Sequence, residues 1–264
     1  MINLEQSGSG RDLVLLPGWG SDGSIFSSLM PTLESHFRVH LGRWQNASNA
    51  FDSKEHHSYD SLSNDELLED IREGLIHQLD HQGVKQAIWV GWSLGGLIAT
   101  DMAQHHPENV ISLMTLAFNP CFVQQDNWSC AMPEDQFTGF QQAFTHQPME
   151  TLNRFIALQV LGAMDRRVLQ KSLSKSQFTI DVLRQAALLN LLQKDLRPAI
   201  SQLSIKQMHC YGELDALVPS AKLMSSMKQL NPQARTQSYA LATHLPFISA
   251  QEAWLKDLLE WCAV

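Results

Sequence analysis

The sequence has few cysteines, no long hydrophobic run and no excess of positive charge. Its four cysteines are far apart and form no CxxC pair, which argues against a zinc site or a dense disulfide framework; they are Cys121, Cys130, Cys210 and Cys262. No apolar run approaches the roughly 18 residues of a membrane span, and the first residues lack the basic start and apolar core of an export signal. We therefore expect a soluble, cytoplasmic protein with no membrane contact.

Positive charge is in the minority, because 19 Lys and Arg are set against 27 Asp and Glu, which gives a formal net charge of −8. A surface of that sign is repelled by phosphate backbones, so we expect no nucleic-acid partner. No internal repeat or low-complexity tract occurs. The 264 residues, 44% of them hydrophobic, are enough for one sizeable core.

A single serine lies between an apolar stretch and the start of a small-residue helix. Ile88–Val90 precedes the serine, Leu97–Ala99 follows it, and glycines flank it at a distance of two residues: Gly91, Ser93 and Gly95. A G-x-S-x-G nucleophile elbow requires this strand–turn–helix context, because the strained turn brings strand and helix so close that larger residues would block it. A glycine-rich turn in an ordinary strand–helix unit is the alternative. The flanking pattern favours the elbow, with Ser93 as nucleophile.

Strands and helices alternate along most of the chain, which predicts an α/β fold with a mostly parallel central sheet flanked by helices. Besides the strand before Ser93, apolar strands are predicted at 12–16, 37–41, 110–116, 205–211 and 236–240. Ser24 is a candidate cap for a helix through about Ser35, and Ser63–Glu66 has the capping-box pattern of a second helix. The polar segment 42–62 is long for a connection, which indicates either a functional lid or a mobile loop.

From about residue 121 to residue 197 the strand signal disappears. Helical patterns replace it at 137–144, 152–161, 166–173 and 182–192. The alternation of strands and helices resumes afterwards. We therefore predict that 1–120 and 198–264 form the core and that 121–197 is an inserted helical cap.

A serine hydroxyl is a weak nucleophile, so it needs a histidine that accepts its proton and a carboxylate that orients the histidine. Asp215 follows a late predicted strand, and His244 follows the last one. This order of serine, acid and histidine is that of the α/β hydrolases. Glu213 is the alternative acid. The other histidines lack metal-ligand spacing, so we expect neither a metal nor a cofactor.

Acyl transfer also needs N–H donors for the oxyanion. In this fold one donor is the amide after the nucleophile, here Leu94, and the other comes from the loop after an early strand, where the amide of Trp19 is the candidate. Several aromatic residues are candidate walls of an apolar acyl pocket, although any of them can equally be core: Trp19, Trp92, Phe140, Phe144, Phe155 and Phe247.

Several segments, in the same order over most of the chain, resemble one family of α/β hydrolases. They are PGWG around Trp19, GWSLGG around Ser93, NPCF after the next strand, GFQQ with RFIALQ in the predicted cap, YGELDALVP around Asp215 and HLPFIS around His244. The family is that of the pimeloyl-[acyl-carrier protein] methyl ester esterases of biotin synthesis. The resemblance implies hydrolysis of the methyl ester of a pimeloyl chain carried on acyl carrier protein. It also implies Ser93, Asp215 and His244 as the triad, with Trp19 and Leu94 as oxyanion donors.

Positive charge is concentrated within the predicted cap. Between residues 151 and 175 the single acid Asp165 is accompanied by Arg154, Arg166, Arg167, Lys171 and Lys175. The last three of these basic residues recur every four positions, which places them on one helix face. A solvated basic face is one interpretation. The other is that Arg154, Arg167 and Lys171 bind an acidic acyl carrier protein, because complementary charge steers association.

The residues alone leave other functions open. A small-molecule carboxylesterase, lactonase or C–C hydrolase has the same fold, because a fold does not determine its substrate. A non-catalytic ligand-binding protein on this scaffold is a third reading, and the complete Ser–Asp–His set argues against it. In each case we expect a monomer.

Overall fold

The computed structural model describes residues 2–44, 62–125, 127–175 and 181–263, so most of the predicted lid segment, 45–61, lies outside the described residues. Within them, the centre is a seven-stranded sheet in the order β1-β3-β2-β4-β5-β6-β7. β1 is antiparallel to β3, and the other neighbouring strands are parallel. The prediction of a mostly parallel α/β sheet is confirmed. The strands are β1 (Ile2–Gly8), β2 (Arg11–Leu16), β3 (Phe37–Trp44), β4 (Ala87–Trp92), β5 (Val110–Leu116), β6 (Lys206–Gly212) and β7 (Arg235–Tyr239).

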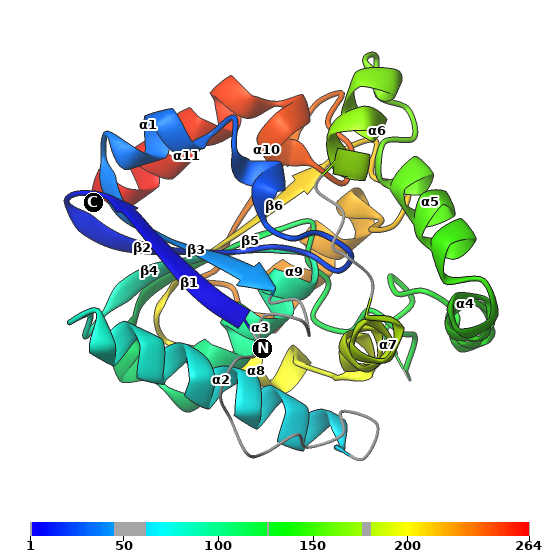
Figure 1. Cartoon of the computed structure of the whole chain (residues 1–264), viewed down its shortest axis with the longest axis horizontal. Helices are drawn as coiled ribbons and strands as arrows, with labels where there is room; N and C mark the ends of the chain where they lie inside the picture. Colours follow the sequence, from blue (N-terminus) through cyan, green and yellow to red (C-terminus); the bar gives the residue numbers. More distant parts are fainter. Residues whose placement is uncertain (1, 45–61, 126, 176–180, 264) are drawn as a thin grey trace.

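Helices cover both faces of this sheet (Figure 1). One face carries α1 (Met30–Glu34) and α11 (Gln251–Ala263), and the other carries α2 (Asn64–His81), α3 (Leu94–His105) and α8 (Arg197–Gln202). α9 (Ser220–Leu230) packs on β6 and β7, and the short α10 (Pro246–Ser249) leads into α11. Because both faces are covered, β4 is buried at every position, which explains its continuous apolar sequence.

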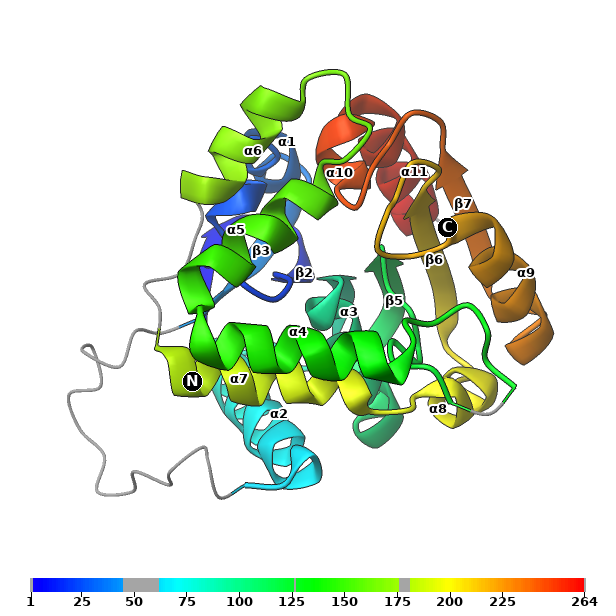
Figure 2. The same ribbon diagram turned by 90° about the vertical axis from the view of Figure 1, so that its right-hand side faces the viewer.

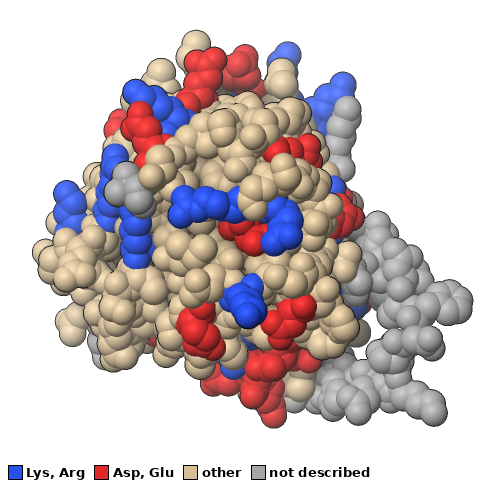
Figure 3. Space-filling model, turned by 90° about the vertical axis from the view of Figure 1, so that its left-hand side faces the viewer, with Lys and Arg blue, Asp and Glu red and all other residues tan. Residues whose placement is uncertain are grey.

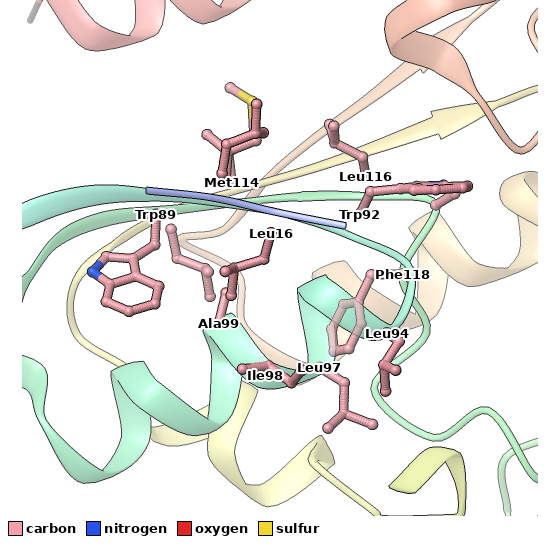
Figure 4. Close-up of a cluster of buried hydrophobic side chains, with 14 of the residues drawn as sticks. Leu16, Trp89, Trp92, Leu94, Leu97, Ile98, Ala99, Met114, Leu116 and Phe118 are labelled. Atoms are coloured by element: carbon pink, nitrogen blue, oxygen red, sulfur yellow. The ribbon is translucent and has the colours of Figure 1, made fainter. Parts of the chain in front are cut away.

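The turn between β4 and α3 is closed by glycines. A Cβ at Gly91 would lie 2.2 Å from the carbonyl oxygen of Gly95, and a Cβ at Gly95 would lie 2.3 Å from that of Leu16. Side chains of α3 then gather with Phe118 beneath the end of β4 (Figure 4). The sequence requirement for small residues around Ser93 is thus steric, and the strand–turn–helix predicted there is confirmed.

Four of the described helices between β5 and β6, those that precede α8, form a separate layer across the carboxyl ends of the parallel strands (Figures 1 and 2). We call these helices the cap: α4 (Glu134–His146), α5 (Pro148–Gln159), α6 (Arg166–Lys175) and α7 (Val182–Asn190). Its two ends meet, because the N–H of Leu196 donates to the carbonyl of Pro120 at 2.7 Å and Cys121 forms an isolated β-bridge with Asp195. The predicted division at 121–197 falls beside this meeting point and stays a prediction.

Two predictions about helix starts have different outcomes. The capping box is confirmed, since the Ser63 hydroxyl accepts from the amide of Glu66 and the Glu66 carboxylate accepts from the amide of Ser63. The single helix predicted from Ser24 to Ser35 is wrong. A short 3-10 turn at Ser24–Phe26 is followed by α1, which starts at Met30 because Pro31 fits only the first turn of a helix.

No helix in the described part of the chain is both long and apolar enough to cross a membrane.

Candidate active site

Ser93 lies at the sharp turn between β4 and α3 with backbone angles φ 52° and ψ −115°. A non-glycine residue with positive φ is strained, and such strain is held only where the surroundings fix it. Here the amide of Ser93 donates to the carbonyl of Leu116 at 2.8 Å, and the glycines let β4 and α3 close around it. The turn presents the Ser93 side chain to a cavity beneath the cap.

Asp215 and His244 come together from two different loops. Asp215 Oδ2 lies 2.8 Å from His244 Nδ1, and the two side chains are 0% and 2% exposed. The other carboxylate oxygen accepts from the amides of Leu217 and Val218, which fixes the rotation of the acid. The alternative acid, Glu213, is directed elsewhere, because its carboxylate accepts from the hydroxyl of Ser238 on β7.

The second ring nitrogen of His244, Nε2, is the one that does not contact Asp215. Nε2 is buried and has no hydrogen-bond partner among the described residues. Since Nδ1 donates to Asp215, Nε2 is the nitrogen that can accept a proton. Ser93 and His244 both line the same cavity. A ring nitrogen left free to accept a proton and a cavity shared with Ser93 are what a general base for this nucleophile requires.

Two backbone amides next to Ser93 are candidate oxyanion donors. Leu94 is the first residue of α3, so its amide has no partner within the helix and lies at the positive end of the helix dipole. The second loop lies against Ser93, because a Cβ at Gly18 would come 3.2 Å from Ser93 Cβ and 3.0 Å from the Trp92 ring. The Trp19 amide follows directly in the chain.

These distances make Gly18 a sensitive position. Gly18→Val would press a branched side chain against Trp92 and Ser93, so the loop and its amide must move away. We expect kcat to fall at least about tenfold, since one oxyanion donor is worth roughly 3 kcal/mol. Kinetics of the purified variant on a methyl ester measure the loss. Gly139→Val in α4 is the control, because a Cβ there meets nothing within 4 Å. An unchanged kcat in a folded Gly18→Val protein would remove the loop from the mechanism.

The cavity is almost wholly apolar. Its polar lining residues are Ser93, Asn119 and His244, and the rest are Trp19, Phe122, Met132, Phe137, Phe140, Phe155, Leu158, Leu189, Leu192 and Leu217. Of the aromatic residues expected to form the acyl pocket, Trp19, Phe140 and Phe155 therefore line it. Phe144 packs behind the Trp19 ring, and Phe247 packs behind Trp92.

Trp92 supports the site without lining the cavity. Its indole N–H donates to the carbonyl of His244 at 2.9 Å, and this hydrogen bond fixes the position of the histidine loop. Arg154, Arg167 and Lys171 are exposed on the outside of the cap and do not line the cavity either. Arg154 forms an ion pair with Glu150 one turn earlier on α5.

Sequence reasoning missed all of the aliphatic lining, the aromatic residues Phe122 and Phe137, and the one amide side chain. Asn119 lies just beyond the carboxyl end of β5, the edge of the sheet at which Ser93 also lies, so its position was a usable signal. Its amide makes three hydrogen bonds: Oδ1 accepts from the amide of Cys121 and the indole of Trp128, and Nδ2 donates to the carbonyl of Cys130. Asn119 therefore braces the start of the cap insertion. The missed Leu189 and Leu192 carried only the apolar periodicity of any buried helix.

Within the described residues, no group of three or more His, Cys, Asp or Glu side chains is arranged to hold a metal ion.

A strained serine at a strand–helix turn, followed along the chain by a paired acid and histidine, is characteristic of the α/β hydrolases. The family model for the alpha/beta hydrolase fold matches residues 13–251. Among solved structures, an esterase from Exiguobacterium antarcticum superposes with a TM-score of 0.82 at 18% identity, covering 100% of this chain and 96% of the other. An enol-lactonase from Burkholderia xenovorans gives 0.80 at 16% identity, covering 100% and 96%. These two likenesses concern the fold.

Relatives at higher identity narrow the family further. The pimeloyl-[acyl-carrier protein] methyl ester esterase of Vibrio cholerae is 35% identical over 97% of this chain and 95% of its own length. Those of Klebsiella pneumoniae and Aliivibrio fischeri are 34% and 36% identical, covering 94% and 96% of this chain and 91% and 94% of their own lengths. The chain belongs to the α/β-hydrolase family and, within it, to the pimeloyl-[acyl-carrier protein] methyl ester esterases.

Proposed function

We propose that this chain is a cofactor-free serine carboxylesterase that hydrolyses the methyl ester of a pimeloyl chain carried on acyl carrier protein. The observation that carries the proposal is the apolar cavity that opens directly onto Ser93 and His244. The names of relatives that match nearly the whole chain support the same substrate.

The proposed reaction has two steps, acylation of Ser93 and hydrolysis of the acyl-enzyme. Ser93 Oγ attacks the ester carbonyl while His244 Nε2 takes its proton, and the amides of Trp19 and Leu94 bind the oxyanion. Collapse of the tetrahedral intermediate expels methanol, which receives the proton from His244. Water then attacks the acyl-enzyme with His244 again as base, and the free carboxylate and Ser93 are released.

The lining of the cavity suits an esterified chain and disfavours the free acid. A pimeloyl methyl ester is neutral along its length, so apolar walls stabilise it as they would any hydrocarbon. The product carries a carboxylate, and a buried charge without a partner is costly. Among the described residues no Lys or Arg lines the cavity, and one of the two N–H donors of the Asn119 amide is already used by the carbonyl of Cys130. We therefore expect the cavity to hold the charged product less tightly than the neutral ester.

The exposed face of α6 supports a carrier protein as partner. Arg166, Arg167 and Lys171 are exposed there, and Asp165 is the one acid beside them. On the side of the molecule drawn in Figure 3, by contrast, basic and acidic side chains are scattered over a mainly uncharged surface. An acidic carrier protein is attracted to the basic face, which would bring its acyl chain toward the cavity.

Charge reversal on α6 separates a carrier-bound substrate from a small ester. We expect Arg167→Glu with Lys171→Glu to lower kcat/KM for the carrier-bound methyl ester at least about tenfold and to leave a small neutral ester nearly unchanged. Raising the salt concentration should weaken the wild type in the same selective way, because exposed charges are screened beyond roughly 10 Å at 0.1 M. Steady-state kinetics on both substrates provide the measurement.

The matched control changes the same amount of charge elsewhere. Lys228→Glu with Lys256→Glu, on α9 and α11, should leave both substrates unaffected. Equal losses on both substrates in the α6 variant, or wild-type kinetics without salt dependence, would instead indicate a small-molecule esterase, lactonase or C–C hydrolase. The monomeric state and the cytoplasmic location stay predictions.

A further inference from the structure

The side chain of Trp19 comes from a core loop but is enclosed by the cap. Its ring makes edge-on contacts with Phe140 and Phe144 of α4 and Phe155 of α5, at centroid distances of 5.7, 5.1 and 5.1 Å. Its indole N–H donates a 2.8 Å hydrogen bond to the carbonyl of Gln185 in α7. Three cap helices therefore hold one side chain, which is 2% exposed.

The backbone on either side of Trp19 is held by the close packing of Gly18 on Trp92 and Ser93 and by a turn hydrogen bond. Gly18 and Gly20 flank it, and Gly20 has φ 76°, a region that favours glycine. Among the described residues, the hydrogen bond that closes this loop runs from the amide of Ser21 to the carbonyl of Gly18 and does not involve Trp19. None of these contacts involves the N–H or C=O of Trp19, so the Trp19 side chain, bonded to Gln185, is a further constraint on the orientation of its peptide.

A second link joins the cap to the catalytic loops. The backbone N–H of His244 donates to the carbonyl of Gln159 at the end of α5, at 3.3 Å. A carbonyl in the last turn of a helix has no intrahelical partner, so it is free to accept. The loop that carries the base and the loop that carries the oxyanion donor are thus both hydrogen-bonded to cap carbonyls.

We propose that Trp19 is a positioning residue in addition to being an oxyanion donor: its indole hydrogen bond to Gln185 holds the Gly18–Trp19 peptide in alignment with Ser93. This inference rests on the proposed function. A donor directed at the oxyanion stabilises the transition state more than the bound ester, so its misalignment lowers kcat and leaves KM nearly unchanged. The cap accordingly contributes to the rate of the chemical step as well as to the shape of the cavity.

Replacing Trp19 with 3-benzothienylalanine tests the hydrogen bond alone. That amino acid keeps the size and aromatic packing of tryptophan, and sulfur takes the place of the indole N–H. We expect kcat for a methyl ester to fall about five- to tenfold with less than a twofold change in KM, as for the loss of one interaction made in the transition state. A trifluoromethyl ketone forms a hemiketal oxyanion with Ser93, so its Ki should rise by the same factor as kcat falls.

Two controls accompany this variant. 7-Azatryptophan at position 19 retains the N–H donor and should restore wild-type kcat. 3-Benzothienylalanine at position 254 removes an indole N–H that has no partner among the described residues, and it should change neither kcat nor Ki. Trp19→Phe removes the same N–H without non-natural chemistry and should lower kcat at least as far.

The outcomes separate this inference from the proposed function. If the position 19 benzothienylalanine protein keeps wild-type kcat and Ki, or if only its KM rises, the side chain does not position the donor. If a serine-directed phosphonate fails to label Ser93 in the wild-type protein, the proposed function itself is wrong. A purely structural role would lower the melting temperature and leave Ki, and kcat per active site titrated with the phosphonate, at their wild-type values.

Discussion

Ser93→Ala is expected to abolish ester turnover while the protein stays folded. The variant removes the nucleophile but keeps the Asp215–His244 pair and both candidate donor amides, so what remains is the slower direct attack of water, assisted by those groups. By analogy with serine proteases, the loss should reach about 10⁴- to 10⁶-fold in kcat. Initial rates with a methyl ester, measured at high enzyme concentration, provide the comparison.

Folding is not expected to limit this experiment. Ser93 is 6% exposed, and its positive φ suits alanine no better and little worse than serine. A circular dichroism melt should therefore lie close to that of the wild type. As an independent check, a phosphonate ester should add covalently to the wild-type protein at Ser93 and leave the variant unmodified by mass spectrometry. Near wild-type turnover by a folded Ser93→Ala protein would refute the assignment of the nucleophile.

The elements nearest to the chemistry were the most predictable from sequence. A Cβ at Gly91 or Gly95 would lie less than 2.5 Å from backbone atoms, so a chain with this turn needs glycine at both positions. The capping box at Ser63–Glu66 is equally local, because side chain and backbone satisfy each other within four residues. Such short-range constraints can be recognised directly in the sequence.

Features that depend on distant partners were not predictable in this way. β1 has only two buried apolar residues, Ile2 and Leu4, and it forms a strand because it pairs with β3, which is far away in the chain. The cavity walls are a similar case. Phe144 and Phe155 are both aromatic residues of amphipathic cap helices, yet Phe155 lines the cavity and Phe144 lies behind Trp19. Only the packing of α4 and α5 over the Trp19 loop decides between them.

The sequence favoured Asp215 over Glu213 as the acid, and the contact of Asp215 with His244 leads to the second large effect. Asp215→Asn is expected to lower kcat about 10³- to 10⁴-fold, as loss of the triad carboxylate does in serine proteases. The asparagine oxygen can still accept from the amides of Leu217 and Val218, so the loop keeps its shape. Its NH₂ group then faces His244 Nδ1 and makes that nitrogen an acceptor. The proton moves to Nε2, where it blocks removal of the proton from Ser93.

Glu213→Gln is the matched control, because it makes the same chemical change two residues earlier in the same loop. Glu213 is exposed and accepts from Ser238, whereas the Asp215 side chain is fully buried against His244. A neutral amide at position 213 can still accept that hydrogen bond, so kcat should stay within about twofold of the wild type. Comparable losses in both variants would mean that the loop acts through its fold alone. A large loss in Glu213→Gln with little in Asp215→Asn would transfer the role of the acid to Glu213.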